Sequence, residues 1–75
     1  MADGAKKDDT QKRSLTIAGH RTSISLEPVF WQALQEAAQD RRMALAALVA
    51  EIDEARTTNL SSAIRGWLVE RVQGT

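Results

Sequence analysis

The chain has 75 residues, with 10 Lys and Arg against 10 Asp and Glu, and it has no cysteine. A chain of this length forms one domain at most and buries only a modest core, while disulfides and a cysteine-bound metal are excluded as stabilisers. The balanced charge excludes a strongly basic nucleic-acid binder, so any such binding has to depend on local clusters of charge.

The first 12 residues are small, polar or charged apart from Met1, which predicts a mobile N-terminal tail followed by one domain over residues 13–75. Charges occupy the start of the chain, where a signal peptide has an apolar stretch, and no apolar run approaches the roughly 20 residues that cross a bilayer. We therefore expect a cytoplasmic protein that makes no membrane contact.

Side chains from residue 21 to residue 26 alternate between polar and apolar, which predicts a strand with two unlike faces. The polar face comprises Arg21, Ser23 and Ser25, and the opposite face, which is mainly apolar, comprises Thr22, Ile24 and Leu26. Leu15 and Ile17 also alternate before Gly19 interrupts the pattern. That earlier stretch fits a second short strand, an extension of the first strand with a bulge, or an ordered arm.

Pro28 suits the first turn of a helix, and apolar residues at steps of three and four carry that helix to about Arg41. After a polar break, a second apolar stripe continues from Leu45 to Ala55. The sequence thus changes from a strand pattern to two successive amphipathic helices.

A third helix is expected over residues 60–72, with Thr58 or Asn59 as its N-cap. We assign Trp31 and Trp67 to the packed interior rather than to a stacking platform, because each lies on an apolar helical stripe. The residues expected in the core of the assembled dimer are Ile24, Leu26, Trp31, Leu34, Leu48 and Ile52.

One amphipathic strand cannot satisfy its own N–H and C=O groups, so it invites pairing with another strand. The simplest partner is the same strand of a second subunit, paired antiparallel across a two-fold axis. The expected fold is therefore a mostly helical homodimer with one N-terminal strand per subunit, followed by two helices and a third C-terminal helix. Folding and dimerisation should then be inseparable, because much of the core under the strand would come from the other chain.

Three segments, residues 20–34, 43–52 and 59–65, resemble the ribbon-helix-helix superfamily of Arc/MetJ type, and more narrowly a branch common in alphaproteobacteria with an added C-terminal helix. The resemblance covers about residues 13–72. It implies a bacterial, dimeric DNA-binding regulator, typically a repressor, whose two-stranded ribbon reads double-stranded DNA in the major groove. The positions that match the base-reading side chains are Arg21, Ser23 and Ser25.

The family also tends to bind a phosphate at the N-terminus of its second helix, which here implicates Arg41, Arg42 and Ala44. The turn usually carries a glycine and then a serine or threonine cap, where this chain has Arg42 and Ala44. Arg42 should therefore adopt a strained left-handed conformation, or the turn should differ. The alternative function is an antitoxin-like interaction module that binds a protein through the C-terminal helix, with weak or no DNA binding.

No motif organises an enzyme site. Ser61 and Ser62 together with Asp53, Glu54 and His20 supply the residue types of a catalytic triad, but no nucleophile-elbow sequence orients them. The serines are expected at the start of a helix and His20 at a solvated strand edge. We predict no catalytic residue, metal or cofactor.

Overall fold

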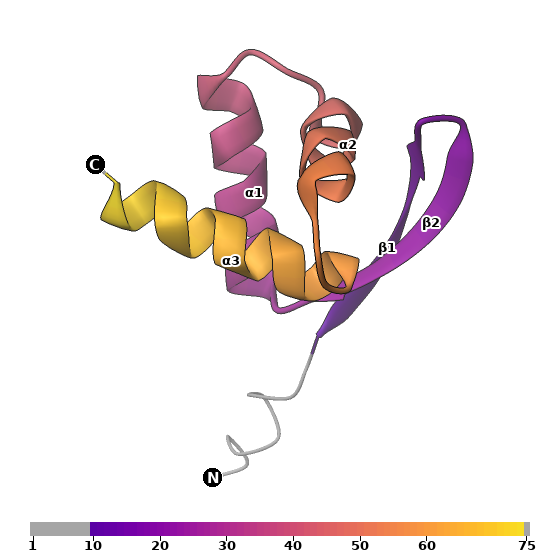
Figure 1. The fold of residues 1–75 in the computed structure, drawn as a ribbon, viewed down its shortest axis with the longest axis horizontal. Helices are drawn as coiled ribbons and strands as arrows, with labels where there is room; N and C mark the ends of the chain where they lie inside the picture. The colour runs from indigo at the N-terminus through magenta and orange to yellow at the C-terminus, as the bar shows by residue number, and fades with distance from the viewer. Residues whose placement is uncertain (1–9, 75) are drawn as a thin grey trace, which may run out of the picture.

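The computed structural model describes residues 10–74 and shows a β-hairpin beside three helices (Figure 1). The elements in chain order are β1 (Gln11–Ile17), β2 (His20–Leu26), α1 (Pro28–Asp40), α2 (Leu45–Ala55) and α3 (Leu60–Gln73). The expected mostly helical class and the three helices are confirmed. The expectation of one strand per chain is wrong, because β1 and β2 form a two-stranded antiparallel sheet within the chain.

The hairpin resolves the alternatives for the stretch before Gly19 in favour of a second strand. Ala18 and Gly19 connect the strands with positive φ angles of 52° and 86°, the pattern of a two-residue turn whose twist matches that of the strands. Such a short loop closes at little entropic cost, so β1 reaches β2 more readily than a second molecule does. Gln11 and Lys12, assigned to the tail by sequence, lie in β1, while residues 1–9 of that tail lie outside the described residues.

The helices begin and end close to the residues that the sequence indicates. Pro28 is at the first helical position of α1, where its missing N–H costs no hydrogen bond. Helix α1 ends at Asp40, with Arg41 as its C-cap. At the start of α3 the Asn59 side chain accepts a hydrogen bond of 2.9 Å from the backbone N–H of Ser62, which confirms Asn59 as the N-cap.

A single chain already encloses an apolar core. The six residues expected at the centre of a dimer are all at most 4% exposed in the isolated chain, so their burial needs no second subunit. The hairpin explains this difference. Helix α2 packs on β1 and helix α3 packs on β2, so the two strands of the same chain cover the core where a second subunit was expected. The buried apolar residues are Ile17, Ile24, Leu26, Trp31, Leu34, Ala37, Ala38, Leu48, Val49, Ile52, Ile64 and Leu68.

Candidate nucleic-acid interface

One face of the hairpin is polar from end to end. The strand alternation turns Arg21 and Ser23 to solvent and leaves Ser25 half-buried, while Ile24 and Leu26 point into the core. The cross-strand register pairs the three polar positions of β2 with three positions of β1 that are all exposed. We call this set the outer ribbon face; its pairs are Lys12 with Ser25, Ser14 with Ser23 and Thr16 with Arg21.

The outer ribbon face combines hydroxyl groups with positive charge. Neither β1 nor β2 contains an Asp or Glu residue, so no carboxylate from the strands opposes Lys12 and Arg21. Arginine and lysine can bond the O6 and N7 acceptors of guanine, and short hydroxyls can donate to or accept from several base edges. The face therefore presents groups that can hydrogen-bond base edges, and its two strands carry no carboxylate that the phosphates beside a groove would repel.

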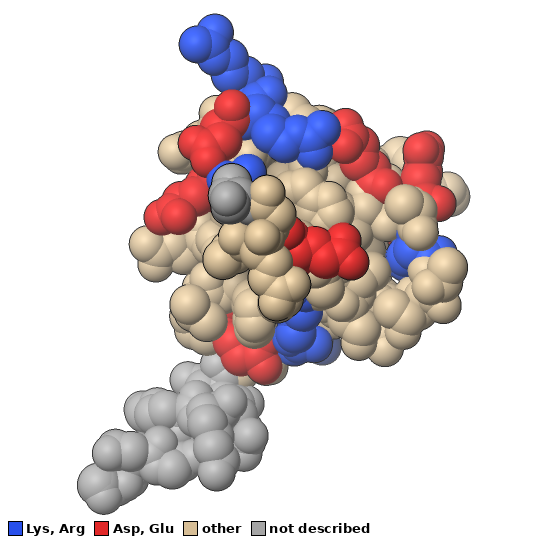
Figure 2. All heavy atoms as spheres, turned by 60° about the vertical axis from the view of Figure 1, so that its left-hand side comes forward, with Lys and Arg blue, Asp and Glu red and all other residues tan. Residues whose placement is uncertain are grey.

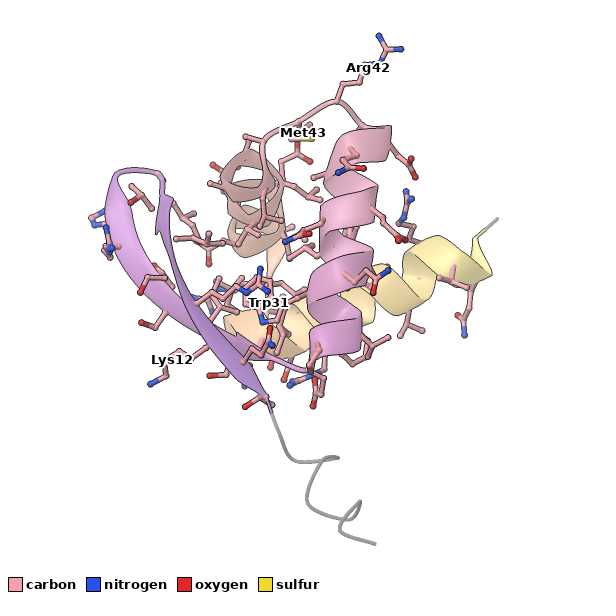
Figure 3. All side chains as sticks on the ribbon, turned by 180° about the vertical axis from the view of Figure 1, so that it is seen from behind. Lys12, Trp31, Arg42 and Met43 are labelled. Atoms are coloured by element: carbon pink, nitrogen blue, oxygen red, sulfur yellow. The ribbon has the colours of Figure 1, made fainter. Side chains whose placement is uncertain are left out.

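The inner face of the hairpin is anchored on Trp31. This side chain is 1% exposed, and its indole N–H donates to the backbone carbonyl of Gln11 at 2.9 Å. The guanidinium of Arg13 lies 4.9 Å from the indole ring centroid, within the range of a cation–π contact. Figure 3 places Trp31 between the hairpin and α1, with Lys12 on the outer side of the hairpin. The tryptophan thus fixes β1 to the helical part of the chain.

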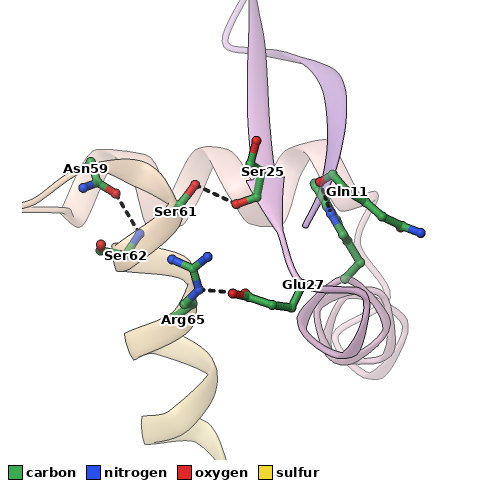
Figure 4. Close-up of polar contacts among 8 residues, drawn as sticks. Gln11, Ser25, Glu27, Asn59, Ser61, Ser62 and Arg65 are labelled. Atoms are coloured by element: carbon green, nitrogen blue, oxygen red, sulfur yellow. Dashed lines mark hydrogen bonds and ion pairs between the residues drawn. The ribbon is translucent and has the colours of Figure 1, made fainter. Parts of the chain in front are cut away.

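Helix α3 holds the C-terminal end of β2. The Ser61 hydroxyl donates to the carbonyl of Ser25 at 3.1 Å, and Arg65 Nε lies 3.0 Å from Glu27 Oε1 (Figure 4). The backbone hydrogen bond at Glu27 and the Arg65 side chain lower the pKa of the Glu27 carboxyl. Glu27 directly follows β2, so its pairing with Arg65 offsets a negative charge beside the outer ribbon face.

The turn between α1 and α2 contains a residue in the left-handed conformation, which is strained for any residue other than glycine. Arg42 has a φ of 57°, in the left-handed region, where a glycine usually ends a helix. The N–H of Met43 donates to the carbonyl of Ala38 at 2.9 Å, and the N–H of Arg42 donates to that of Gln39 at 3.0 Å. These two bonds define a Schellman motif, which projects the Arg42 side chain away from the body of the molecule (Figure 3).

Helix α2 begins without a side-chain cap. Ala44 is the N-cap and makes no side-chain hydrogen bond, and the first helical bond runs from the N–H of Leu48 to the carbonyl of Ala44 at 3.1 Å. The amides of the first turn are therefore available to an anion, as at other helix N-termini. The Arg41 side chain is engaged by other partners and not by these amides or an anion beside them, because its guanidinium lies 3.2 Å from Glu51 and 6.0 Å from the Trp67 ring centroid.

Positive charge without a carboxylate partner gathers at two places among residues 10–74. Four arginines form ion pairs on the helices or at their ends, namely Arg41, Arg56, Arg65 and Arg71. Lys12 and Arg21 on the hairpin and Arg42 at the α1–α2 turn make no ion pair with a described residue. The hairpin turn and the α1–α2 connection lie toward the same end of the molecule (Figure 1).

From His20 onward, Asp and Glu slightly outnumber Lys and Arg. The structure shows that the folded part begins earlier, at β1, so the charges of that strand have to be counted as well. Strand β1 adds Lys12 and Arg13 to the folded part and adds no acid. Sequence reasoning missed Lys12, Ser14 and Thr16 as candidate contacts because it placed Lys12 in the tail and left the pairing of this stretch open. The available signal was the alternation of exposed polar residues with Leu15 and Ile17.

Other expected roles are placed as follows. Ser61 and Ser62 lie in the first turn of α3, and His20 is exposed at the start of β2. Within the described part of the chain, no three His, Cys, Asp or Glu side chains are grouped so that they could hold a metal ion. None of the described helices is long and apolar enough to span a membrane.

Comparison with known proteins agrees with this architecture. A family model described as a ribbon-helix-helix domain matches residues 10–72, which include both strands and nearly all of the three helices. No curated protein and no solved structure matches the chain significantly. Proteins of this family are commonly DNA-binding regulators. The matched region covers most of the chain, and the protein therefore belongs to the ribbon-helix-helix domain family.

Proposed function

We propose that the protein is a homodimeric, sequence-specific DNA-binding regulator that acts as a transcriptional repressor in the bacterial cytoplasm. The observation that carries this proposal is the outer ribbon face, a polar surface with two cations and no strand carboxylate. Membership of a family whose members are typically homodimeric and DNA-binding supports it.

In this proposal Arg21 supplies most of the base discrimination, because its guanidinium can bond a guanine edge in bidentate fashion. Ser23 and Ser25 add weaker contacts through their hydroxyls. Arg42 and the free amides that follow Ala44 contact the phosphate backbone, which positions the ribbon without reading sequence. Arg41 serves as a link between α1 and α2 through Glu51, so its contribution to phosphate binding is smaller than that of Arg42.

The decisive experiment compares Arg21→Ala with Arg56→Ala in a selection from random duplexes at a stated salt concentration. Arg21 is exposed on the outer ribbon face, whereas Arg56 is bound to Asp53 at 2.6 Å at the end of α2. Arg21→Ala should cost about 1–3 kcal/mol in binding and relax the sequence preference, and Arg56→Ala should change neither. Absence of salt-dependent binding to any duplex by the unaltered protein would refute the proposal.

The dimer is tested by sedimentation over a range of concentrations. A homodimer would bind a symmetric operator with two half-sites, and a pair of β2 strands across the two-fold is one arrangement that could form it. A monomer that stays monomeric on its operator would refute the dimeric part of the proposal. Circular dichroism on the same samples reports whether dissociation unfolds the chain.

A second candidate function rests on an apolar groove between α1 and α3. Val29, Val69 and Val72 are 68%, 45% and 74% exposed, and all three line this groove of about 460 Å³ together with Phe30 and Leu68. In Figure 2, which faces the C-terminal end of α3, uncharged atoms make up much of the surface, with charges of both signs around them. An amphipathic helix of a partner protein fits such a surface.

The double variant Val29→Asp/Val69→Asp distinguishes a protein-interaction function from the proposed DNA-binding function. If the groove binds a protein helix, the variant should lose that partner and keep its affinity for DNA. Loss of DNA binding with an unchanged melting temperature would instead assign the groove to the DNA-binding assembly.

A further inference from the structure

The first half of helix α3 is fixed to the joint between β2 and α1. Glu27 is the one residue between that strand and that helix. On the strand side of the joint, the Ser61 hydroxyl donates to the carbonyl of Ser25 at 3.1 Å. At the joint itself, Arg65 Nε lies 3.0 Å from Glu27 Oε1. Figure 4 shows both contacts, which come from successive turns of α3.

The second half of α3 is fixed to the opposite end of α1. Arg71 pairs with the carboxylate of Asp40, the last residue of α1. The Trp67 ring centroid lies 6.0 Å from the guanidinium of Arg41, the C-cap of α1. Asp40 and Arg41 directly precede Arg42, so α3 contacts both residues that lead into the α1–α2 turn.

These contacts make α3 the element that sets the angle between β2 and α1. A joint of one residue can rotate about its φ and ψ, so the strand and the helix on either side need a third element to fix their orientation. Helix α3 packs on both of them and also on α2 (Figure 1). With 13 residues, α1 is about 20 Å long, so a rotation of about 10° at the joint would move the α1–α2 turn by about 3 Å. A shift of that size breaks a hydrogen bond.

We propose that α3 is a brace that holds β2 and the α1–α2 turn in the relative positions from which both contact one DNA duplex. This inference rests on the proposed DNA-binding function and adds four positioning residues to it, namely Ser61, Arg65, Trp67 and Arg71. They act through β2 and the turn rather than by touching DNA. All four contacts lie within one subunit, so the brace works in the same way when β2 belongs to a ribbon shared by two subunits.

The strand end of the brace is tested with Ser61→Ala and the matched control Ser62→Ala. Both variants remove one hydroxyl from the first turn of α3 and leave the charge unchanged. Ser61 bonds β2 through its hydroxyl, whereas Ser62 bonds Asn59 through its backbone N–H, which alanine retains. Ser61→Ala should lower the affinity for DNA about two- to tenfold, and Ser62→Ala should leave it unchanged.

The turn end of the brace is tested with Asp40→Asn and the matched control Asp53→Asn. Each variant removes one carboxylate from an ion pair, but Asp40 joins α1 to α3, whereas Asp53 pairs with Arg56 three residues along the chain. Charge alone predicts slightly tighter DNA binding by both variants, because each is less negative. The brace predicts the opposite sign for Asp40→Asn, a loss of about two- to fivefold. The slope of log affinity against log salt should also fall, because the displaced turn loses a phosphate contact although no cation has been removed.

The double variant Ser61→Ala/Asp40→Asn tests whether the two ends act through one element. Effects of distant, independent sites multiply in affinity. Releasing either end of a brace already frees the joint, so the double variant should bind no more than about twofold more weakly than the weaker of the two single variants. All variants are compared at a temperature at which circular dichroism shows them folded.

Unchanged or tighter binding in Ser61→Ala and Asp40→Asn, a loss confined to one of them, or losses that multiply in the double variant would each overturn this inference. The proposed function would stand in all three cases, because the unaltered protein still binds DNA. Absence of binding by the unaltered protein would overturn both, so the two failures are distinguishable in one set of measurements.

Discussion

Replacing Arg42 with glycine should stabilise the fold and weaken DNA binding at the same time. Arg42 has a φ of 57° at the end of α1, and its side chain points into solvent. An L-residue pays roughly 1–2 kcal/mol to adopt the left-handed conformation, and glycine does not. Glycine in turn loses about 0.5–1 kcal/mol more backbone entropy on folding. The net expectation is a gain of about 0.5–1 kcal/mol for Arg42→Gly.

The assay is urea denaturation followed by circular dichroism, with all variants at equal protein concentration because a dimer would make stability depend on concentration. For a domain of this size, a gain of 1 kcal/mol raises the melting temperature by about 4–8 °C. Arg42→Lys is the matched control, because lysine retains both the charge and the strained conformation. Its free energy of unfolding should equal that of the unaltered protein.

The same two variants separate strain from charge in DNA binding. Loss of one phosphate contact should reduce the slope of log affinity against log salt by about one in Arg42→Gly and leave it unchanged in Arg42→Lys. If Arg42→Gly is no more stable than Arg42→Lys, the backbone strain at this turn is not the cost that we assign to it. An unchanged salt slope would remove Arg42 from the phosphate contacts.

Three further changes test other parts of the structure. Ala44→Ser should add about 1 kcal/mol of stability by capping α2 and should raise affinity for all duplexes alike, and a gain in stability without a gain in affinity would argue against a phosphate at this helix. Ile24→Lys should unfold the chain by circular dichroism, because it places a charge at a position that is 2% exposed; a folded variant would mean that the faces of β2 are reversed. A backbone hydrogen bond and the Arg65 side chain hold the pKa of Glu27 below its ordinary value of 4.5, so these contacts of the ionised carboxylate contribute stability above that range and lose it as pH falls through the lowered pKa. The stability difference between the unaltered protein and Glu27→Gln should therefore shrink on acidification, and a difference that is constant with pH would contradict this role.

The sequence by itself determined those elements that a few neighbouring residues specify, through an alternation of side chains or a residue typical of a helix start. The alternation from residue 21 to residue 26 predicted both faces of β2, since successive side chains of a strand point to opposite sides. Pro28 predicted the start of α1, and Thr58 or Asn59 predicted the start of α3, because each of these residue types satisfies a requirement of a first helical turn by itself; the structure selects Asn59. The departure at Arg42 predicted either a strained left-handed residue or a different turn, and the structure shows the left-handed residue.

Only the tertiary structure decided the partner of β2 and the extent of the candidate interface. The first half of β1 has the polar residues Gln11 and Arg13 on its inner face. This half is held in place by Trp31, because Arg13 packs over the indole ring and the Gln11 backbone carbonyl accepts the indole N–H. Period-two hydrophobicity cannot reveal a strand that is held in this way, and the strand therefore extends into the segment assigned to a tail. Pairing within the chain needs only the two-residue turn at Ala18 and Gly19, so it forms without the loss of freedom that association with a second molecule requires.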